Sequence, residues 1–335
     1  MSAGGERPGE RREAAPAADP ADAARLETEL RGVMCGRIHP GEPLARHTTM
    51  RIGGPALLLA VPDSEADVAQ ALRWATMRGL SWRVIGLGSN LLCPDEGFPG
   101  LAIDLQTACG TTRFSGTSVE VGAGVHLSPL IQAAAARGLA GLEGVAGVPG
   151  TVGGALAMNA GTAAGDMGAV VRRVRALTPD GHLVEITGAE MRFGYRTSRL
   201  QDDGLVALGA VLALRSTDAA VVRAELRARA LRRRQTQPLE LPNAGSIWRN
   251  PPGDYAGRLI EAAGCRGWRC GDAQVSPKHG NFIVNLGQAR AAEVIGLMAL
   301  VRAQVQACFG VRLEPELCWL WGREALLALL DGKVD

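Results

Sequence analysis

The chain has 335 residues, with 36 lysine and arginine residues against 34 aspartate and glutamate residues and a formal net charge of +2 at pH 7. A single hydrophobic core seldom grows much beyond about 250 residues, so this length predicts two or three domains. The near-neutral charge balance provides no basic stripe and argues against a nucleic-acid-binding protein.

The cysteines and histidines indicate a protein of a reducing compartment. The seven cysteines are scattered and contain no C-x-x-C pair, and the five histidines show no ligand spacing. We therefore expect reduced thiols, no structural metal and a cytoplasmic location. A run of about eighteen apolar residues is absent from the sequence, so we expect no membrane-spanning helix.

The N-terminal segment, residues 1–42, has little to bury and is expected to be a disordered tail with a short helix near Ala21–Gly32. Arg11-Arg12 is the start of a twin-arginine pattern, but Ala, Glu and Pro follow where an export signal needs apolar residues. Export is therefore not expected.

The first ordered pattern is strand, helix, strand. A strand at Ala56–Val61 precedes a helix within Asp63–Gly79, for which Ser64 is the candidate N-cap. A second strand, Trp82–Ile85, leads into the glycine loop Gly86–Asn90.

The loop Gly86-Leu87-Gly88-Ser89-Asn90 has three interpretations that the loop alone does not separate. A dinucleotide fingerprint is weak, because a third glycine and a helix do not follow. A plain turn is the second. The third is a phosphate nest, in which backbone N–H groups together with the Ser89 hydroxyl and the Asn90 amide bind a pyrophosphate.

Further elements are expected in the middle of the chain. Short strands are predicted at Leu101–Asp104 and Ser118–Val121, a helix at Ser128–Arg137, a hairpin at Val170–Thr178 and His182–Thr187, and a strand near Leu205–Leu214.

The stretch Gly144–Gly161 contains Gly147, Gly150, Gly153 and Gly154 and is too glycine-rich for a helix yet too apolar for a solvated linker. A single glycine here would be a tight buried turn. The group of glycines around Pro149 instead predicts the wall of a site at which a flat or phosphorylated ligand approaches the backbone.

The last third has a different composition and begins near Ser216, with a helix predicted over Asp218–Arg234. Ser246, in N-A-G-S-I-W-R-N-P, lacks a G-x-S-x-G frame and an evident activating partner, so a hydrolase nucleophile is not supported. Its hydroxyl could still donate a proton to a strongly basic carbanion. Lys278 is one of only two lysines, the other being Lys333.

Motifs in collinear order carry a resemblance to a known family. From His47 to Gly322 the chain contains T-T-M-R-I-G-G-P-A, G-L-G-S-N-L-L, G-V-P-G-T-V-G-G-A, M-N-A-G, F-G-Y-R-T-S, R-R-R-Q-T-Q-P, N-A-G-S-I-W-R-N-P, A-G-R-L-I-E-A-A-G, H-G-N-F-I-V-N and L-E-P-E. This ordered set resembles the UDP-N-acetylenolpyruvoylglucosamine reductases (MurB). Tyr195-Arg196 is followed directly by a short loop and a strand. In this the chain resembles the shorter of the family's two subtypes, which lacks an inserted substrate-covering loop.

The resemblance implies an α+β fold. A flavin-binding part of the vanillyl-alcohol-oxidase (PCMH) type consists of two α+β subdomains, with FAD between them, and is followed by a C-terminal α+β substrate-binding domain. The boundaries that we expect are 43–108 for the first FAD-binding subdomain, 109–215 for the second and 216–325 for the substrate-binding domain.

The resemblance also implies a flavin-dependent oxidoreductase of peptidoglycan precursor synthesis, and hence of cell wall biogenesis, cell shape, the cell cycle and cell division. NADPH reduces non-covalently bound FAD, and UDP-N-acetylglucosamine enolpyruvate is then reduced to UDP-N-acetylmuramate. The cofactor-binding residues would be Gly86, Gly88, Ser89, Asn90, Val148, Pro149, Gly150, Thr151, Gly153 and Gly154.

The family's catalytic residues fall on Arg196, Ser246 and Glu316. Ser246 would donate the proton, Arg196 would grip the substrate carboxylate, and Glu316 would donate a hydrogen bond as the neutral acid. The candidate substrate contacts are Tyr195, Asn250 and Lys278, and Lys278 with its neighbour His279 is also a candidate contact of NADPH. The chain is expected to act as a monomer without membrane insertion.

The chain departs from the family pattern at several positions. Leu87 stands where glycine is usual, Gly144-Val145 replaces a bulkier pair, and Leu317–Gly322 lacks the usual basic residue. Two other functions stay open from the residues. An FAD-linked oxidase or dehydrogenase of a sugar or hydroxy acid would not need Ser246 and Glu316, and a flavin-binding protein without catalysis would not need Arg196 either.

Overall fold

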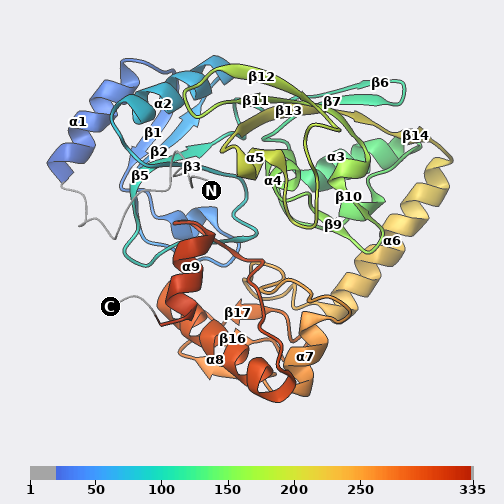
Figure 1. Cartoon of the computed structure of the whole chain (residues 1–335). Coiled ribbons are helices and arrows are strands. Elements are labelled where there is room, and N and C mark those ends of the chain that lie inside the picture. Colours follow the sequence, from blue (N-terminus) through green and yellow to red (C-terminus); the bar gives the residue numbers. More distant parts are fainter. Residues whose placement is uncertain (1–19, 333–335) are drawn as a thin grey trace, which may run out of the picture. The chain divides into compact units, whose positions relative to one another are not determined.

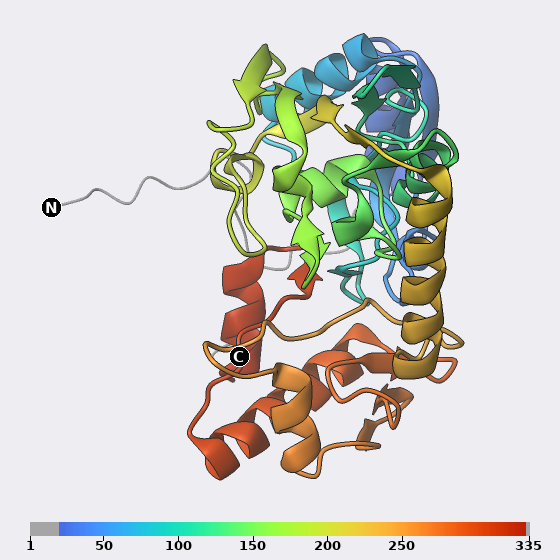
Figure 2. The ribbon, with the colours of Figure 1, turned by 90° about the vertical axis from the view of Figure 1, so that its right-hand side faces the viewer.

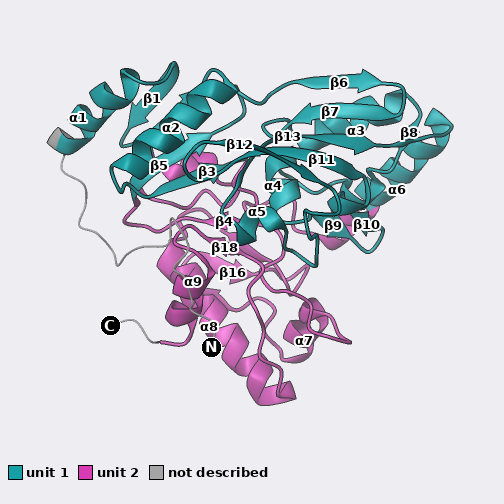
Figure 3. Ribbon diagram, turned by 45° about the horizontal axis from the view of Figure 1, so that its top comes forward, with its two compact units in different colours: residues 1–42, 56–86, 99–231 teal, residues 43–55, 87–98, 232–335 magenta. Residues whose placement is uncertain are grey.

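The computed structural model describes residues 20–332, which form two compact units (Figure 3). Unit 1 takes in the chain up to Glu42, then Ala56–Gly86 and Pro99–Leu231. Unit 2 takes in Pro43–Pro55, Leu87–Phe98 and the chain from Arg232 onward. The disordered tail was predicted over residues 1–42, of which residues 1–19 lie outside the described part of the chain. For residues 20–42 the prediction of disorder beyond a short helix was wrong, because the strand Gly36–Pro40 pairs in a sheet and Leu30, Met34 and Ile38 are buried in the core. The domain boundaries at 43, 109 and 216 stay predictions.

Unit 1 contains two main sheets (Figure 1). The first has the order β1-β2-β5-β3, in which β1 and β2 are antiparallel and β3 and β5 are parallel. The second is antiparallel in the order β12-β11-β13-β7-β6. The strands are β1 (Gly36–Pro40), β2 (Ala56–Pro62), β3 (Trp82–Ile85), β5 (Phe98–Asp104), β6 (Thr112–Ser115), β7 (Ser118–Gly122), β11 (Val171–Leu177), β12 (Leu183–Thr187) and β13 (Val206–Ala213).

The strands and helices predicted for this unit are confirmed to within a few residues. The helices are α1 (Pro20–Arg31), α2 (Glu65–Met77), α3 (Leu127–Ala136), α4 (Val152–Ala157), α5 (Arg199–Asp202) and α6 (Ala219–Thr236), the last of which runs past Leu231. Ser64 caps α2 as expected, since its Oγ accepts the N–H of Asp67 at 3.2 Å. The core includes Leu58 and Ile103 of the first sheet and Trp74 of α2.

Short elements complete unit 1 around the glycine-rich stretch. They are β8 (Leu139–Ala140), β9 (Gly161–Thr162), β10 (Gly165–Asp166), β14 (Arg215–Ser216) and the 3-10 helices η2 (Glu143–Val145) and η3 (Met167–Ala169).

The expectation that Gly144–Gly161 is too glycine-rich for a helix was wrong. α4 (Val152–Ala157) begins inside it, because the Thr151 Oγ1 accepts the N–H of Gly154 and caps the first turn. Position 153 of this helix favours glycine, because a Cβ there would lie only 3.1 Å from the Cβ of Ala123. Close packing, rather than an unusual φ, therefore accounts for this glycine.

Unit 2 is built around a long helix and a small sheet. Its elements are η1 (Leu44–His47), β4 (Leu91–Leu92), α7 (Ala256–Ala262), β15 (Arg269–Cys270), β16 (Ala273–Val275), β17 (Ile283–Asn285), α8 (Ala291–Phe309), β18 (Cys318–Trp319) and α9 (Arg323–Leu330). The sheet has the order β15-β16-β17, and β4 pairs with β18 in parallel. Helices α7, α8 and α9 were not predicted from the sequence; α8 and α9 are red in Figure 2.

Helix α8 corrects the expectation about membrane-spanning segments. By length and composition its 19 residues would suffice to cross a membrane. One face of the helix, with Val294, Leu297, Met298, Val301 and Val305, is buried in the core of unit 2, whereas Leu300 and Phe309 are exposed.

Candidate functional site

The loop Gly86–Asn90 follows directly from β3. Gly88 has φ +58, and a Cβ there would lie 2.2 Å from the carbonyl oxygen of His47, so the fold requires glycine at this position. Within the described part of the chain, the N–H groups of Leu87 and Gly88 donate to no acceptor. Two consecutive free N–H groups beside a left-handed residue have the form of an anion-binding nest.

The wall loop, residues Gly147–Gly154, is fixed by its neighbours in unit 1. Leu127 donates to the carbonyl of Gly150 at 3.0 Å, and Val152 donates to the carbonyl of Val125 at 2.8 Å. Gly147 has φ +81 and Gly150 has φ +148, conformations that favour glycine.

Open backbone donors remain in this wall loop. Among residues 20–332, the N–H groups of Gly147, Gly150 and Thr151 have no acceptor, and Pro149 has no N–H. A Cβ at Gly86 would be 2.6 Å from the Oγ1 of Thr151, so the end of β3 packs directly against the wall loop. Gly150 is half-buried and Thr151 is buried, whereas Gly147 is exposed. N–H groups in buried or half-buried places are normally paired, so the donors of Gly150 and Thr151 fit the polar groups of a flat, phosphorylated cofactor.

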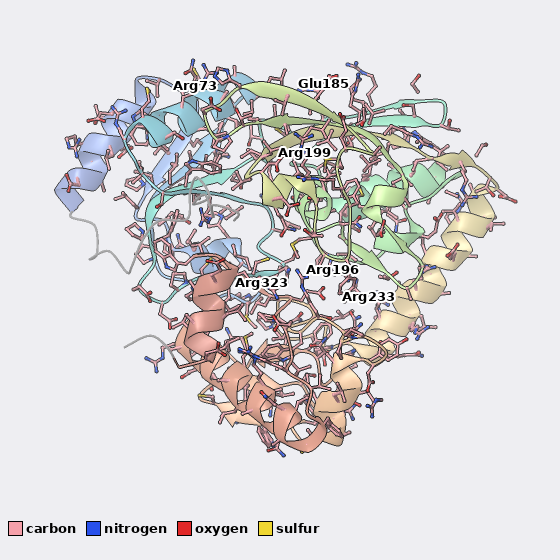
Figure 4. All side chains as sticks on the ribbon, in the orientation of Figure 1. Arg73, Glu185, Arg196, Arg199, Arg233 and Arg323 are labelled. Atoms are coloured by element: carbon pink, nitrogen blue, oxygen red, sulfur yellow. The ribbon has the colours of Figure 1, made fainter. Side chains whose placement is uncertain are left out.

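Arg196, labelled in Figure 4, lies at the tip of a tight turn in unit 1. Gly194 donates to the carbonyl of Thr197 at 3.1 Å, and Thr197 donates back at 3.4 Å. The Arg196 Nη2 donates to the carbonyl of Gly161 at 2.9 Å, and its Cζ lies 5.0 Å from the centroid of the Tyr195 ring. The guanidinium is half-buried and Tyr195 is exposed, so the turn presents this pair at the surface of the unit.

Ser246 lies in unit 2, directly after a rigid turn. The Asn243 Oδ1 accepts the N–H of Gly245 at 3.0 Å, and Gly245 has φ +72. The residues after Ser246 are extended: Ile247 donates to the carbonyl of Asn281, and Trp248 donates to the Oδ1 of Asn281 at 2.9 Å. Within the described residues the half-buried Ser246 hydroxyl makes no hydrogen bond, which leaves it available to a ligand.

Glu316 lies on a segment that runs beside Ser246. The N–H of Glu316 donates to the carbonyl of Ile247 at 2.8 Å, and that of Arg249 donates to the carbonyl of Glu314 at 2.8 Å. The Arg323 guanidinium, labelled in Figure 4, fixes this segment from α9 by donating to the Glu314 carboxylate at 2.6 Å and to the Pro315 carbonyl at 3.0 Å.

Asn90 connects the glycine loop to this same segment. Its Nδ2 donates to the carbonyl of Glu316 at 3.0 Å, and its carbonyl accepts the N–H of Cys318 at 3.0 Å, where β4 and β18 pair. Residues 88–92, 246–249 and 314–319 therefore form one hydrogen-bonded arrangement within unit 2. This arrangement places three predicted site residues, Asn90, Ser246 and Glu316, on neighbouring hydrogen-bonded segments.

The remaining predicted substrate contacts have bonds within unit 2. The Asn250 Oδ1 accepts the N–H of Ala256 at 3.1 Å at the start of α7. The Lys278 Nζ donates to the carbonyl of Arg234 at 2.7 Å and lies 3.7 Å from the Glu240 carboxylate. The assignment of both residues as substrate contacts stays a prediction.

Sequence reasoning missed Asn159, which is buried. Its amide nitrogen donates to the carbonyl of Gly194 in the Arg196 turn, and its amide oxygen accepts the N–H of Gly168. The M-N-A-G motif was the available signal, but its partner Gly194 lies 35 residues further along the chain.

Comparisons with known proteins find similarity over most of the chain. Residues 237–320 match the family model of the UDP-N-acetylenolpyruvoylglucosamine reductase C-terminal domain, and residues 56–187 match that of an FAD-binding domain. The chain is 47% identical over 300 residues to UDP-N-acetylenolpyruvoylglucosamine reductase 2 of Symbiobacterium thermophilum, covering 90% of this chain and 96% of the relative. It is 44% identical to the reductase of Moorella thermoacetica, covering 90% and 99%.

A solved structure shows the same relationship. The reductase from Thermus caldophilus matches with a TM-score of 0.72 and 37% identity, over 85% of this chain and 99% of that one. The predicted fold, a PCMH-type FAD-binding part followed by a C-terminal substrate domain, is confirmed. The chain therefore belongs to the UDP-N-acetylenolpyruvoylglucosamine reductase (MurB) family, the FAD- and NADPH-dependent oxidoreductases that reduce UDP-N-acetylglucosamine enolpyruvate to UDP-N-acetylmuramate in peptidoglycan precursor synthesis.

Proposed function

We propose that Ser246, Glu316 and Arg196 carry out this reduction in the present chain, with Ser246 as the proton donor. The observation that supports the proposal most directly is the arrangement in unit 2, which holds Asn90, Ser246 and Glu316 on hydrogen-bonded neighbouring segments. FAD, when bound, supplies the hydride that the enolpyruvyl group accepts.

The residues proposed to hold FAD are those of the glycine loop and the wall loop. The free N–H groups of Leu87 and Gly88 suit the pyrophosphate, since a nest of backbone N–H groups binds an anion without help from a helix. The wall loop, with free N–H groups at Gly147, Gly150 and Thr151, suits the polar edge of the flat ring system. Side chains at the glycines would block this approach.

Ser246 acts at the carbon beside the substrate carboxylate. When hydride reaches the methylene carbon, negative charge develops on that neighbouring carbon, which becomes strongly basic. A hydroxyl can protonate such a carbon although it is useless toward a weak base, because proton transfer follows the difference in pKa. The Ser246 hydroxyl makes no hydrogen bond with the described residues, so no protein acceptor competes for its proton.

Arg196 and Glu316 stabilise the charge that develops near the carboxylate. The Arg196 guanidinium can bind both carboxylate oxygens and withdraw charge from the neighbouring carbon. Glu316 in its neutral form would donate a hydrogen bond to the same group. Tyr195, which lies against Arg196, orients the guanidinium rather than reacting, and Asn250 and Lys278 contact the sugar nucleotide.

We further propose that the enzyme acts as a cytoplasmic monomer without membrane insertion. Burial of the apolar face of α8 in the core of unit 2 supports the last point. The seven cysteines all lie in the described part of the chain and form no disulfide there, which supports a reducing compartment.

An anaerobic stopped-flow experiment tests the proposed activity. The purified protein is reduced with NADPH, mixed with UDP-N-acetylglucosamine enolpyruvate, and followed by flavin absorbance. We expect rapid reoxidation without oxygen, with UDP-N-acetylmuramate as the product. A flavin that stays reduced until air is admitted would contradict the proposal and favour an oxidase.

A further inference from the structure

The backbone of Arg196 adopts a conformation that its surroundings must maintain. Its φ is +59, in the left-handed region that residues other than glycine adopt rarely. Such a residue persists only when neighbouring contacts hold it, and such residues concentrate at functional sites. The contacts that hold this turn therefore decide where the guanidinium lies.

Asn159, on the segment that follows α4, provides the side-chain contact to the start of the turn. It is 3% exposed. Its Nδ2 donates to the carbonyl of Gly194 at 3.0 Å, and its Oδ1 accepts the N–H of Gly168 at 2.8 Å. Because a donor faces Gly194 and an acceptor faces Gly168, only one orientation of the amide satisfies both partners.

The same segment also binds the side chain of Arg196. Gly161, two residues after Asn159, accepts the hydrogen bond from the Arg196 Nη2 at 2.9 Å. A Cβ at Gly161 would be 2.6 Å from the Cβ of Asp166, so this carbonyl is closely packed in its place. The M-N-A-G segment thus contacts both the backbone of the turn and its guanidinium.

We propose that Asn159 is a positioning residue for Arg196. It fixes the turn Gly194–Thr197 so that the guanidinium meets the substrate carboxylate in one geometry. This inference rests on the proposed role of Arg196. A residue that only stabilised the fold would show the same bonds, so the test must separate positioning from stability.

The variant Asn159→Asp makes that separation. It keeps the size of the side chain and the acceptor that faces Gly168, but it replaces the N–H donor with an oxygen beside the carbonyl of Gly194. The turn then loses its anchor and gains a repulsive contact. Asn285→Asp is the matched control, because Asn285 is also buried (2% exposed) and its Nδ2 also donates to a carbonyl, that of Met50 at 3.0 Å.

Two quantities are measured on holoenzyme: the dissociation constant of UDP-N-acetylmuramate by calorimetry, and the anaerobic rate at which substrate reoxidises the flavin. A misplacement of about 1 Å can cost up to about 100-fold in rate, so we expect Asn159→Asp to slow reoxidation by about 10- to 100-fold and to weaken product binding. Flavin reduction by NADPH should change little. Asn285→Asp should lower the melting temperature while leaving both quantities within about twofold of wild type.

The decisive comparison repeats Asn159→Asp in an Arg196→Ala background. If Asn159 acts through Arg196, the second substitution adds no further loss of product affinity or reoxidation rate. Losses that add fully, or an Asn159→Asp enzyme equal to wild type, would overturn the positioning role while leaving the proposed function intact. If Arg196→Ala alone changes neither quantity, the assignment of Arg196 fails and the inference fails with it.

Discussion

At the residue scale, the proposed proton transfer depends on one serine of unit 2, Ser246. The Asn243 side chain and Gly245 fix the preceding turn, and Asn281 fixes the following strand, so Ser246 is held on both sides. Its hydroxyl is half-buried and makes no hydrogen bond with residues 20–332. A rigid backbone with an uncommitted hydroxyl is the arrangement that a proton donor needs.

Replacement of Ser246 by alanine should separate the two half-reactions. Flavin reduction by NADPH should stay nearly intact, because that step needs no proton at the substrate carbon. Reoxidation by substrate should slow by several orders of magnitude, on the scale of losing a general acid or more. Single-turnover stopped-flow measures both rates. Ser115→Ala, at an exposed serine, is the control, and equal slowing of both steps in Ser246→Ala would contradict the proton-donor role.

The cysteines allow a second test at this scale. Burial raises the pKa of the Cys93 and Cys109 thiols to about 12, whereas Cys35 and Cys308 are exposed. In native protein near pH 8 we expect the exposed pair to react with a thiol reagent and the buried pair to react only after unfolding, as read by mass spectrometry.

The raised pKa of these two buried thiols also makes the stability of the folded protein depend on pH. Because the folded pKa lies above that of the unfolded thiol, about 8.5, the native state keeps protons that the unfolded state loses. The contribution of Cys93 and Cys109 is thus complete below about pH 8.5 and is lost as the pH rises toward 12. Rapid labelling of Cys93 in native protein would contradict this burial.

At the element scale, the sequence predicted elements best where the cap or turn is local. Helix α2 begins after Ser64, and the hairpin between β11 and β12 turns at Gly181, with φ +78. Helix α8 was missed because its cap is remote: the Asp95 carboxylate accepts the N–H groups of Ala291 and Ala292 at 2.7 and 3.0 Å. One local signal was available, because the Glu293 carboxylate accepts the N–H of Arg290 at 3.1 Å, but arginine is not among the usual N-cap residues.

Gly88→Ala tests the glycine loop as an element of the fold. The left-handed conformation alone costs a non-glycine residue about 1–2 kcal/mol, and the new Cβ would also lie 2.2 Å from a backbone oxygen that cannot move away easily. We expect a lowered melting temperature and loss of bound FAD on purification. Gly116→Ala is the matched control, because Gly116 has φ +56 and nothing within 4 Å of its added Cβ. Equal effects of the two substitutions would argue against the close contact at Gly88.

At the scale of the whole molecule, binding of FAD should appear as stability. A ligand at 100 times its dissociation constant adds about 2.7 kcal/mol to the stability of the state that binds it. Adding FAD to apoprotein should therefore raise the melting temperature by several degrees, as recorded by calorimetry. Riboflavin, which lacks the pyrophosphate, should stabilise much less. Equal stabilisation by the two compounds would contradict the role of the Leu87 and Gly88 N–H groups.

The sequence by itself determined the family and the chemistry. Ordered motifs carry glycines, an arginine, a serine and a glutamate at collinear positions, and these are the residues that we propose to bind the flavin and to act on the substrate. The same reasoning located the strands and capped helices of unit 1, because local capping and turn residues act within a few positions along the chain.

Only the tertiary structure decided which of these residues are held together and by what. Asn90 bonds to Glu316 across 226 residues, Asn159 reaches Gly194 across 35, and Asp95 caps α8 across 196. Each of these bonds satisfies a buried or half-buried polar group whose partner is set by packing rather than by spacing in the sequence. The left-handed φ of Arg196 belongs to the same class, because its neighbours impose it and its own side chain disfavours it.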